Sequence, residues 1–531
     1  MRLFFVFSFL FITGSAITQS KIDVLHYKYS IELNDNNDSI YGKAEIKLKL
    51  LQSASTIKFD LVKRNGSGKG MVVDSITGPA VRGFVKDQDS IRIILMPGTG
   101  PLVNDTAIYI VRYHGVPADG LIISKNKYGH RTFFADNWPN RAHNWIPCVD
   151  DPADKASVEF IVTAPSHYQV ISNGVQVEET NLADNKKLTH YKEDVPLPTK
   201  VMVIGVAEFA VQNAGMVNCV PVYSWVYPED KKDGFYDYAL AKNILSFFDS
   251  YIGPYPYKKL ANVQSKTIFG GMENAGAIFY AESTVTGDRS SESLLAHEIV
   301  HQWFGDMATE KSFAHLWLSE GFATYLAHLY DESKYGLDKF SNDMKAERDE
   351  IIAFVKSSRK PVVDSVSPYM QLLNTNSYQK GSWVLHMLRR QLGDSVFRKS
   401  IRTYYAKFAG KNADTRDLQK VFESVSGKDL DQFFTQWLYT PECPQLEIKW
   451  KYLEKEQKLS VTVKQLQQTV FQMPLQISIV TSQGMRTPRF YKIEISKAVE
   501  TFLLPTGKKP HSVQPDMETS LLAEFSVSET K

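Results

Sequence analysis

Two histidines one helical turn apart are the feature that most constrains this chain. The segment from His297 to His301 reads His-Glu-Ile-Val-His. A helix turns once per about 3.6 residues, so both imidazoles stand on one helix face and can hold a single metal ion. Glu298 lies between them, where a carboxylate can work on a water at that ion. Glu320 follows His301 with 18 residues between them and offers a carboxylate that a second helix can bring to the same ion. This spacing predicts a metal site built on two packed helices.

The length and composition indicate a globular protein of several domains. With 531 residues the chain is too long for a single core, and about three domains are expected. The formal net charge of +2 gives no reason to expect nucleic acid as a partner. The three cysteines, Cys148, Cys219 and Cys443, are too few for a disulfide scaffold, and we expect buried structural thiols.

The first 16 residues predict a cleaved signal peptide. Arg2 precedes an apolar run over residues 3–12, and the small residues 13–16 mark a possible cleavage point. The run is too short for a normal transmembrane helix, and no other stretch is long enough, so we expect no stable membrane span. An uncleaved anchor is the alternative. The segment predicts a secreted or periplasmic protein.

Strand patterns dominate the part of the chain that follows. Residues 27–33 and 44–50 alternate between apolar and polar side chains, as strands with one wet face do. The turn-forming residues 34–38 between them predict a hairpin. The strand pattern continues to about Phe209, and we predict an N-terminal β domain over residues 17–208.

Helical spacing then replaces the alternation. A helix is expected from Leu240 to Tyr251, and another begins near Ser290 and Ser291 and carries the two histidines. We predict a catalytic domain over residues 209–440. Alternation returns at 446–450 and 459–463, which predicts a β-sandwich over residues 441–531, about the size of an immunoglobulin-like module. The expected fold class is therefore multidomain α+β.

Two further motifs carry candidate chemistry. The segment Phe269-Gly270-Gly271-Met272-Glu273-Asn274 contains paired glycines, which let an extended peptide approach as an added strand. A glycine turn in a hairpin explains the same residues. Tyr378, in Tyr378-Gln379-Lys380-Gly381, can donate to an oxyanion that forms beside the metal. Alternatively, Tyr378 serves only the start of the following helix.

Taken in order, these motifs resemble the gluzincin zinc aminopeptidases, the aminopeptidase N and leukotriene-hydrolase type. Residues 147–152 (Pro-Cys-Val-Asp-Asp-Pro) and 253–257 (Gly-Pro-Tyr-Pro-Tyr) belong to the same resemblance, which covers nearly the whole chain. It implies a saddle-like N-terminal β-sheet domain and a thermolysin-like catalytic domain. The chain departs in length from the longer members, so we expect the short form without their large C-terminal helical domain. The resemblance also implies one Zn²⁺ per chain and peptide or oligopeptide substrates with a free N-terminus.

The resemblance assigns a role to each motif residue. His297, His301 and Glu320 are the expected zinc ligands, Glu298 the general base and Tyr378 the oxyanion donor. Glu273 is expected to bind the α-ammonium of the substrate. The other substrate-binding residues are expected to be Gly270, Gly271, Met272, Asn274 and, at the first side-chain pocket, Phe269.

One departure from the family pattern concerns the wall of that pocket. Aligned on Pro147, Trp138 stands where many members carry Glu or Gln. Asp136 or Asn137 can substitute for it, or Trp138 shapes the first pocket, or Trp138 packs a domain interface.

Three other functions stay open beside the aminopeptidase. An inactive binding scaffold on this fold is one, although every metal ligand and the base are present. A lipid epoxide hydrolase is the second, and it requires a long apolar pocket. An endopeptidase is the third, and Glu273 counts against it, because an internal peptide has no ammonium to offer there.

Overall fold

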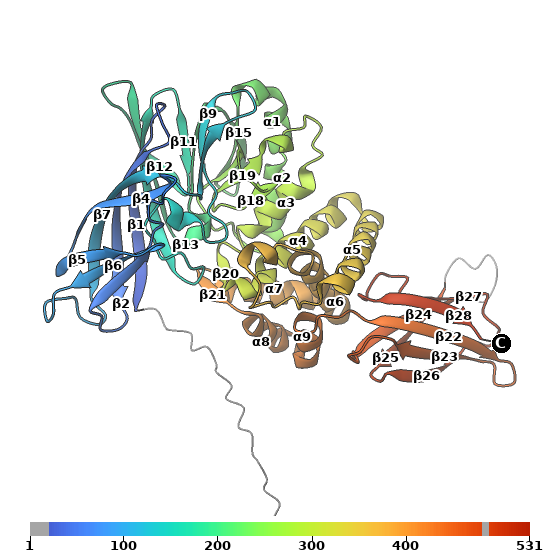
Figure 1. Ribbon diagram of the computed structural model, residues 1–531. Coiled ribbons are helices and arrows are strands. Elements are labelled where there is room, and N and C mark those ends of the chain that lie inside the picture. Colours follow the sequence, from blue (N-terminus) through green and yellow to red (C-terminus); the bar gives the residue numbers. More distant parts are fainter. Residues whose placement is uncertain (1–20, 481–487, 531) are drawn as a thin grey trace, which may run out of the picture.

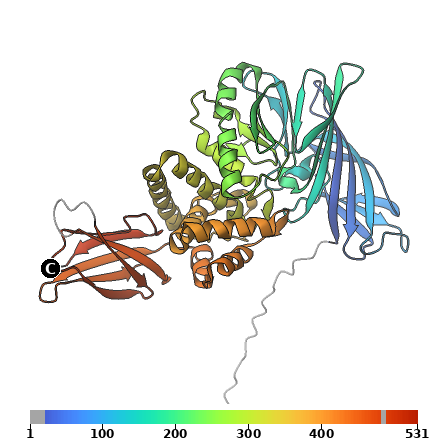
Figure 2. The same ribbon diagram turned by 180° about the vertical axis from the view of Figure 1, so that it is seen from behind.

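The computed structural model describes residues 21–480 and 488–530. Three regions follow one another along the molecule: a β-rich N-terminal region, a middle region of helices and a mixed sheet, and a β-rich C-terminal region (Figures 1 and 2). This arrangement confirms the predicted α+β multidomain fold. The predicted signal peptide falls outside the described residues. Within the part of the chain that is described, no helix is long and apolar enough to cross a membrane.

The N-terminal region is built on one large sheet. Its strands are β1 (Ile22–Glu32), β2 (Ile40–Leu50), β4 (Gly70–Thr77), β7 (Thr106–Val116), β10 (Lys155–Pro165), β12 (Val175–Asn181) and β13 (Lys186–Pro198), in the spatial order β12-β13-β10-β1-β2-β7-β4. β1 and β2 pair antiparallel, which confirms the predicted hairpin. Their alternating apolar side chains, such as Tyr27 and Ile46, are buried, because the pleat directs every second residue to the core face.

Two smaller sheets complete this region. One contains β3 (Thr56–Asp60), β5 (Val81–Lys86) and β6 (Ser90–Leu95), and the other contains β8 (Leu121–Lys125), β9 (Arg131–Ala135), β11 (Gln169–Ser172) and β14 (Ile204–Ala207). The chain then passes to a different sheet at β15 (Ala210–Val217). The predicted boundary at 208/209 falls in this passage, and the domain boundaries stay predictions.

Strands continue beyond Phe209, where the sequence pattern suggested that helices take over. β15 and β16 (Val220–Val226) form a hairpin and join β17 (Leu260–Ser265), β19 (Ala277–Ala281) and β18 (Gly271–Met272) in the order β15-β16-β17-β19-β18. Cys219 lies in the tight turn of this hairpin with a positive φ of 67° and is exposed, so the expectation of three buried thiols was wrong for it. Cys148 and Cys443 are buried, and all three thiols are free.

Helices make up most of the rest of the middle region. They are α1 (Lys231–Tyr238), α2 (Ala241–Tyr251), α3 (Glu292–His301), α4 (Trp317–Tyr335), α5 (Leu337–Ser358), α6 (Gly381–Leu392), α7 (Asp394–Phe408), α8 (Thr415–Ser426) and α9 (Asp431–Leu438), with short strands β20 (Ala308–Glu310) and β21 (Lys411–Ala413). The helices expected at 240–251 and after Ser291 are confirmed. Ser291 does not cap α3 with its side chain; its hydroxyl donates to the carbonyl of Thr284 instead.

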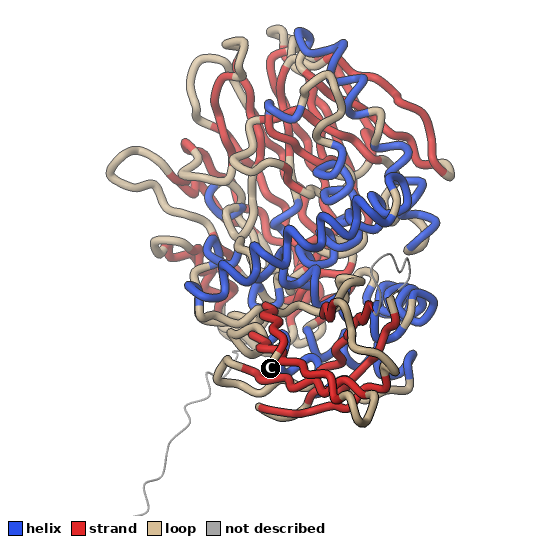
Figure 3. The backbone as a smooth tube through the Cα atoms, turned by 90° about the vertical axis from the view of Figure 1, so that its right-hand side faces the viewer, coloured by secondary structure: helices blue, strands red, loops and turns tan. Residues whose placement is uncertain are grey.

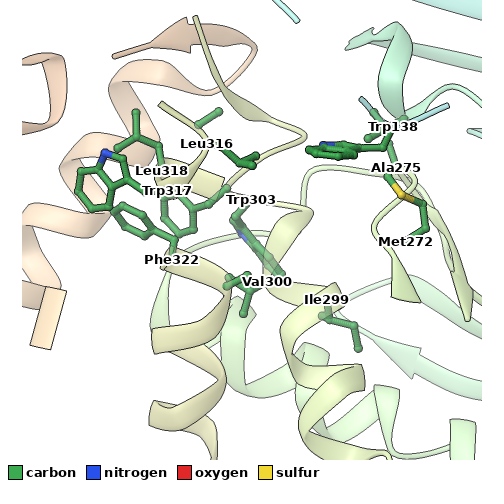
Figure 4. Close-up of a cluster of buried hydrophobic side chains, with 14 of the residues drawn as sticks. Trp138, Met272, Ala275, Ile299, Val300, Trp303, Leu316, Trp317, Leu318 and Phe322 are labelled. Carbon is green, nitrogen blue, oxygen red and sulfur yellow. The ribbon is translucent and has the colours of Figure 1, made fainter. Parts of the chain in front are cut away.

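Close packing joins α3, α4 and α6. Buried aromatic and aliphatic side chains, among them Val300, Trp303 and Phe322, fill the space around α3 and the start of α4 (Figure 4). Gly321 of α4 and Gly381 of α6 meet backbone to backbone: a Cβ on Gly321 would lie 2.9 Å from the Cα of Gly381. Only glycine permits this approach, which sets the turn before α6 against the beginning of α4.

The C-terminal region consists of two facing sheets. Their strands are β22 (Gln445–Leu453), β23 (Lys458–Gln465), β24 (Met473–Val480), β25 (Arg489–Ile495), β26 (Val499–Pro505), β27 (Ser512–Pro515) and β28 (Glu524–Glu529), in the orders β26-β23-β22-β28 and β25-β24-β27. They lie together beside the helices of the middle region in Figure 1, and Figure 3 shows them facing the viewer around the C-terminus. The two alternating segments form β22 and β23, which confirms the predicted strands, and the structure pairs them antiparallel.

Replacing Gly321 with alanine tests the backbone contact between α4 and α6. The added methyl group has no room, and overpacking of this kind costs about 1–3 kcal/mol. Gly321→Ala should therefore lower the free energy of unfolding, measured by denaturant titration. Gly83→Ala is the matched control, because a Cβ on Gly83 meets nothing within 4 Å. Equal stability of the two variants would contradict the tight contact.

Candidate metal centre and cavity

His297, His301 and Glu320 converge on one point. The Nε2 atoms of the two histidines lie 3.1 Å apart, and each lies 3.3 Å from Oε2 of Glu320. All three candidate ligand atoms fall within 4.8 Å of one another. α3 supplies both histidines one turn apart and α4 supplies the glutamate, as the motif spacing requires. One cation can contact all three side chains.

The ring of His301 is oriented by groups on its other side. Its Nδ1 lies 3.1 Å from the carbonyl oxygen of Phe304 and 3.0 Å from the hydroxyl of Ser319. A carbonyl only accepts, so Nδ1 carries the proton and Nε2 keeps its lone pair for a metal. The histidine is thus held in the tautomer and direction that a ligand needs.

The electrostatics of the three residues favour a positive charge between them. Burial favours the neutral acid, yet the imidazoles of His301 and His297 lower the pKa of Glu320 below its ordinary value. Burial likewise opposes protonation of His301, but the carboxylate of Glu320 raises its pKa to about 10. The buried carboxylate of Glu320 is therefore stable only beside a positive charge. A metal ion stabilises it better than a proton shared with an imidazole.

Glu298 lies beside the triad under the backbone of Gly271. A Cβ on Gly271 would lie 2.4 Å from Oε1 of Glu298, so this glycine allows β18 to approach the carboxylate. Burial raises the pKa of Glu298 well above its ordinary value; His301 opposes this shift, and the carboxylates of Glu273 and Glu320 add to it. A carboxyl group with a raised pKa is suited to accept and return a proton.

Tyr378 reaches the site from the turn before α6. It belongs to a π-helical turn, Asn376–Lys380, and its ring stacks on His297 at a centroid distance of 5.9 Å and an interplanar angle of 17°. Burial, followed by the carboxylates of Glu320 and Glu273, raises the pKa of Tyr378 well above its ordinary value. The phenol therefore stays protonated and remains a hydrogen-bond donor.

Glu273 follows directly after the end strand β18. The amide of Gln302, next to α3, donates to the Glu273 carbonyl at 2.7 Å and fixes its backbone. The Oε1 atom of Glu273 is buried without a hydrogen-bond partner among the described residues, and the ammonium of Lys200 lies 3.9 Å away. An incompletely paired carboxylate in this position can accept a further cationic group.

A cavity of about 620 Å³ connects these residues. Its lining includes the triad, Glu298, Tyr378 and the segment from Phe269 to Glu273. Asn274, predicted to bind substrate, is fully buried and does not line this cavity. Trp138 from the N-terminal region forms one wall, and its ring meets Phe269 and Phe313 edge to face at 5.9 and 5.8 Å. Figure 4 shows Trp138 and Met272 within the same buried cluster.

The polar residues before Trp138, Asp136 and Asn137, form hydrogen bonds outside the cavity. Asp136 accepts a hydrogen bond of 2.9 Å from the amide of Ile268 and forms an ion pair with Arg141. Asn137 donates to the carbonyl of Met202 at 2.6 Å. Neither side chain lines the cavity. Trp138 is therefore the residue that faces the cavity at this point, and it also packs between the two regions.

Some residues that shape the site carry no signal in the sequence. Lys200 of the N-terminal region and Glu310 of β20 form a fully buried ion pair at 2.7 Å, beside Glu273. They are 110 positions apart, and only the tertiary fold brings them together. Ser319 could have been suspected as a supporting group because it precedes Glu320 directly.

Comparison with known proteins agrees with this geometry. The Peptidase M1 N-terminal domain model matches residues 24–201, and the Peptidase family M1 domain model matches residues 236–437. Aminopeptidase M1-C of Oryza sativa subsp. japonica is 31% identical over 334 residues, which are 58% of this chain and 37% of that protein. Tricorn protease-interacting factor F2 of Thermoplasma acidophilum is 29% identical over 450 residues, which are 79% of this chain and 54% of that protein.

Probable aminopeptidase 2 of Sulfurisphaera tokodaii is 29% identical over 342 residues, which are 60% of this chain and 43% of that protein. The aligned parts thus span about half or less of each relative's length. The two matched family models cover most of the N-terminal and middle regions and include both helices of the metal triad. The chain belongs to peptidase family M1.

Proposed function

We propose that this chain is a zinc aminopeptidase that removes single residues from peptide N-termini. The observation that carries the proposal is the incompletely paired carboxylate of Glu273 in the same cavity as the metal triad and Glu298. A triad with a base explains hydrolysis of a peptide bond. The additional carboxylate of Glu273 explains why the site would select the positively charged N-terminus of a peptide substrate.

The donor set fits zinc. Two imidazole nitrogens and one carboxylate oxygen are a common catalytic set, and they leave a fourth position open. Zn²⁺, when bound, supplies a Lewis acid that lowers the pKa of water and polarises a carbonyl group. His297, His301 and Glu320 would hold one such ion per chain.

The protein's own groups supply the proton transfers. Glu298 takes a proton from the attacking water and passes it to the leaving amine, as a base with a raised pKa can. The protonated hydroxyl of Tyr378 donates to the oxygen of the scissile carbonyl as it becomes negative. Both interactions strengthen in a site from which water is largely excluded.

The path of the substrate follows β18. This strand ends its sheet, so an extended peptide can pair along it, and Gly270 and Gly271 leave room for the peptide backbone. Glu273 then binds the α-ammonium and sets the distance from the chain end to the metal. Charged groups in the cavity lining, among them Asp331 and Asp343, suit a peptide better than a lipid tail.

A panel of aminoacyl fluorogenic amides, with and without a chelator, tests this function. We expect turnover that the chelator abolishes and added Zn²⁺ restores. A protein that retains zinc and releases nothing from any member of the panel would support the inactive scaffold instead. Turnover unaffected by the chelator would overturn the metal mechanism.

Glu298→Gln should separate catalysis from metal binding. The amide cannot accept the proton from water, and general-base catalysis is worth about 10²- to 10⁴-fold. We expect kcat to fall by that factor while the zinc content, measured by atomic absorption, stays at the wild-type level. Substantial residual turnover with zinc in place would remove Glu298 as the base.

Glu273→Ala should lower the cleavage of substrates with a free α-amino group and leave that of N-acetylated substrates unchanged. Loss of one charged hydrogen bond costs roughly 1.5–3 kcal/mol. We expect kcat/KM for a free-amine substrate to fall roughly 10- to 100-fold. An N-acetylated substrate has no ammonium to place beside residue 273. The wild type and Glu273→Ala should therefore cleave it equally poorly. A similar proportional loss on both substrates would contradict an anchoring role.

Trp138→Ala should alter the preference for the first side chain. The variant removes an aromatic wall whose edge-to-face contacts are each worth about 0.5–1.5 kcal/mol. We expect kcat/KM for phenylalanyl amides to fall more than for alanyl amides, with Trp138→Phe in between. Equal losses for both substrates would place Trp138 outside the first pocket.

A further inference from the structure

A second cluster of candidate ligands lies in the same cavity. His328 and Asp331 are three residues apart on α4 and therefore share a face of the helix, and Asp343 of α5 joins them. The candidate ligand atoms of the three residues lie within 4.8 Å of one another. An ion placed between them can touch all three.

Asp331 supplies an observation that points to a missing ligand. Its side chain is buried, with 2% of the residue exposed. Oδ2 accepts a hydrogen bond of 2.9 Å from the hydroxyl of Ser293, whereas Oδ1 has no hydrogen-bond partner in the described parts of the chain. A buried carboxylate oxygen without a partner is costly, and a cation at the cluster removes that cost.

His328 is oriented as metal-binding histidines usually are. Its Nε2 lies 2.8 Å from Oε1 of Glu347, which fixes the proton on Nε2. Nδ1 then keeps its lone pair and lies 3.9 Å from Oδ2 of Asp343. A carboxylate behind a histidine is a recurring support of metal sites, because it holds the ring and raises its basicity.

A positive charge already occupies the edge of the cluster. The ammonium of Lys339 contacts Asp343 and lies 3.8 Å from Oδ2 of Asp331. The Lys339 side chain is 47% exposed, so it can turn outward into solvent without losing buried packing. The field of the two carboxylates thus attracts cations, and Lys339 is a competitor that a multivalent ion can displace.

We propose that His328, Asp331 and Asp343 form a second binding site for a divalent transition-metal ion. One imidazole nitrogen and two carboxylate oxygens suit Zn²⁺ or Mn²⁺ better than Ca²⁺, which takes oxygen ligands. His328 lies eight residues after Glu320 on one helix, a rise of about 12 Å. The two groups of candidate ligands have no residue in common, so they form separate sites and not a two-metal centre, in which the ions lie about 3.5–4 Å apart. The site is separate from the first triad and does not depend on the proposed peptidase activity.

Calorimetric titration of the metal-depleted full chain with Zn²⁺ tests the proposal. We expect two sites in the wild type and one in His297→Ala, which loses the first site. Asp343→Asn should also retain one site, and the double variant should bind none. Asp338→Asn, which removes an exposed charge from the same helix, is the matched control and should keep both sites.

Two further variants, which leave the three proposed ligands in place, test the second site even if a ligand substitution disturbs folding. Glu347→Gln leaves the three ligands intact, and loss of such a supporting group should weaken the second site about 10- to 100-fold. Lys339→Met removes the competing ammonium and should lower the dissociation constant of the second site. The proposal is overturned if His297→Ala binds no Zn²⁺, or if Lys339→Met leaves the second-site affinity unchanged or weaker.

Discussion

The packing of α3 against α4 is the constraint on which the site depends. It brings two imidazoles and a carboxylate to within about 3 Å of one another in a buried environment. Charged groups pay a large desolvation cost there unless each has a partner of opposite charge. The aromatic packing around Trp303 and Phe322 and the glycine contact with α6 supply the stability that holds them together.

The N-terminal region contributes directly to the cavity. Trp138 forms a wall of it, and Lys200 enters the middle region as a buried cation between Glu310 and Glu273. Removing one partner of such a pair leaves an uncompensated buried charge, at a cost of about 3–5 kcal/mol. The carboxylate expected to bind the substrate ammonium is therefore positioned by both regions, and neither region alone forms the complete cavity.

The sequence predicted the metal triad because its geometry is local. His297 and His301 need only one helical turn, and Glu320 lies in the first turn of the next α-helix, after a connection over residues 302–316 that contains β20. The hairpin of β1 and β2 and the C-terminal strands were likewise visible as alternation. The strands β15 and β16 were missed, because neither alternates cleanly between apolar and polar residues: β15 is largely exposed and mixes polar and small side chains, and β16 is apolar at nearly every position.

Other features required the tertiary structure. The Lys200–Glu310 pair joins residues 110 positions apart, and the cluster at His328 needs α5 to fold back along α4. At residues 136–138, Asp136 and Asn137 are hydrogen-bonded by backbone groups of other segments and do not line the cavity, whereas the role of Trp138 in the first pocket stays a prediction. The local sequence pattern does not show which distant residues come into contact, so these partners could not be predicted from the sequence.

The proposed site binds the free α-ammonium of a peptide and cleaves the first peptide bond after it. This proposal is tested most directly by mass spectrometry of one defined peptide and its N-acetylated form, each incubated with the zinc-loaded protein. The account predicts a ladder of products shortened by one residue at a time from the free peptide, and an intact acetylated peptide. Internal fragments, or equal cleavage of both peptides, would contradict it.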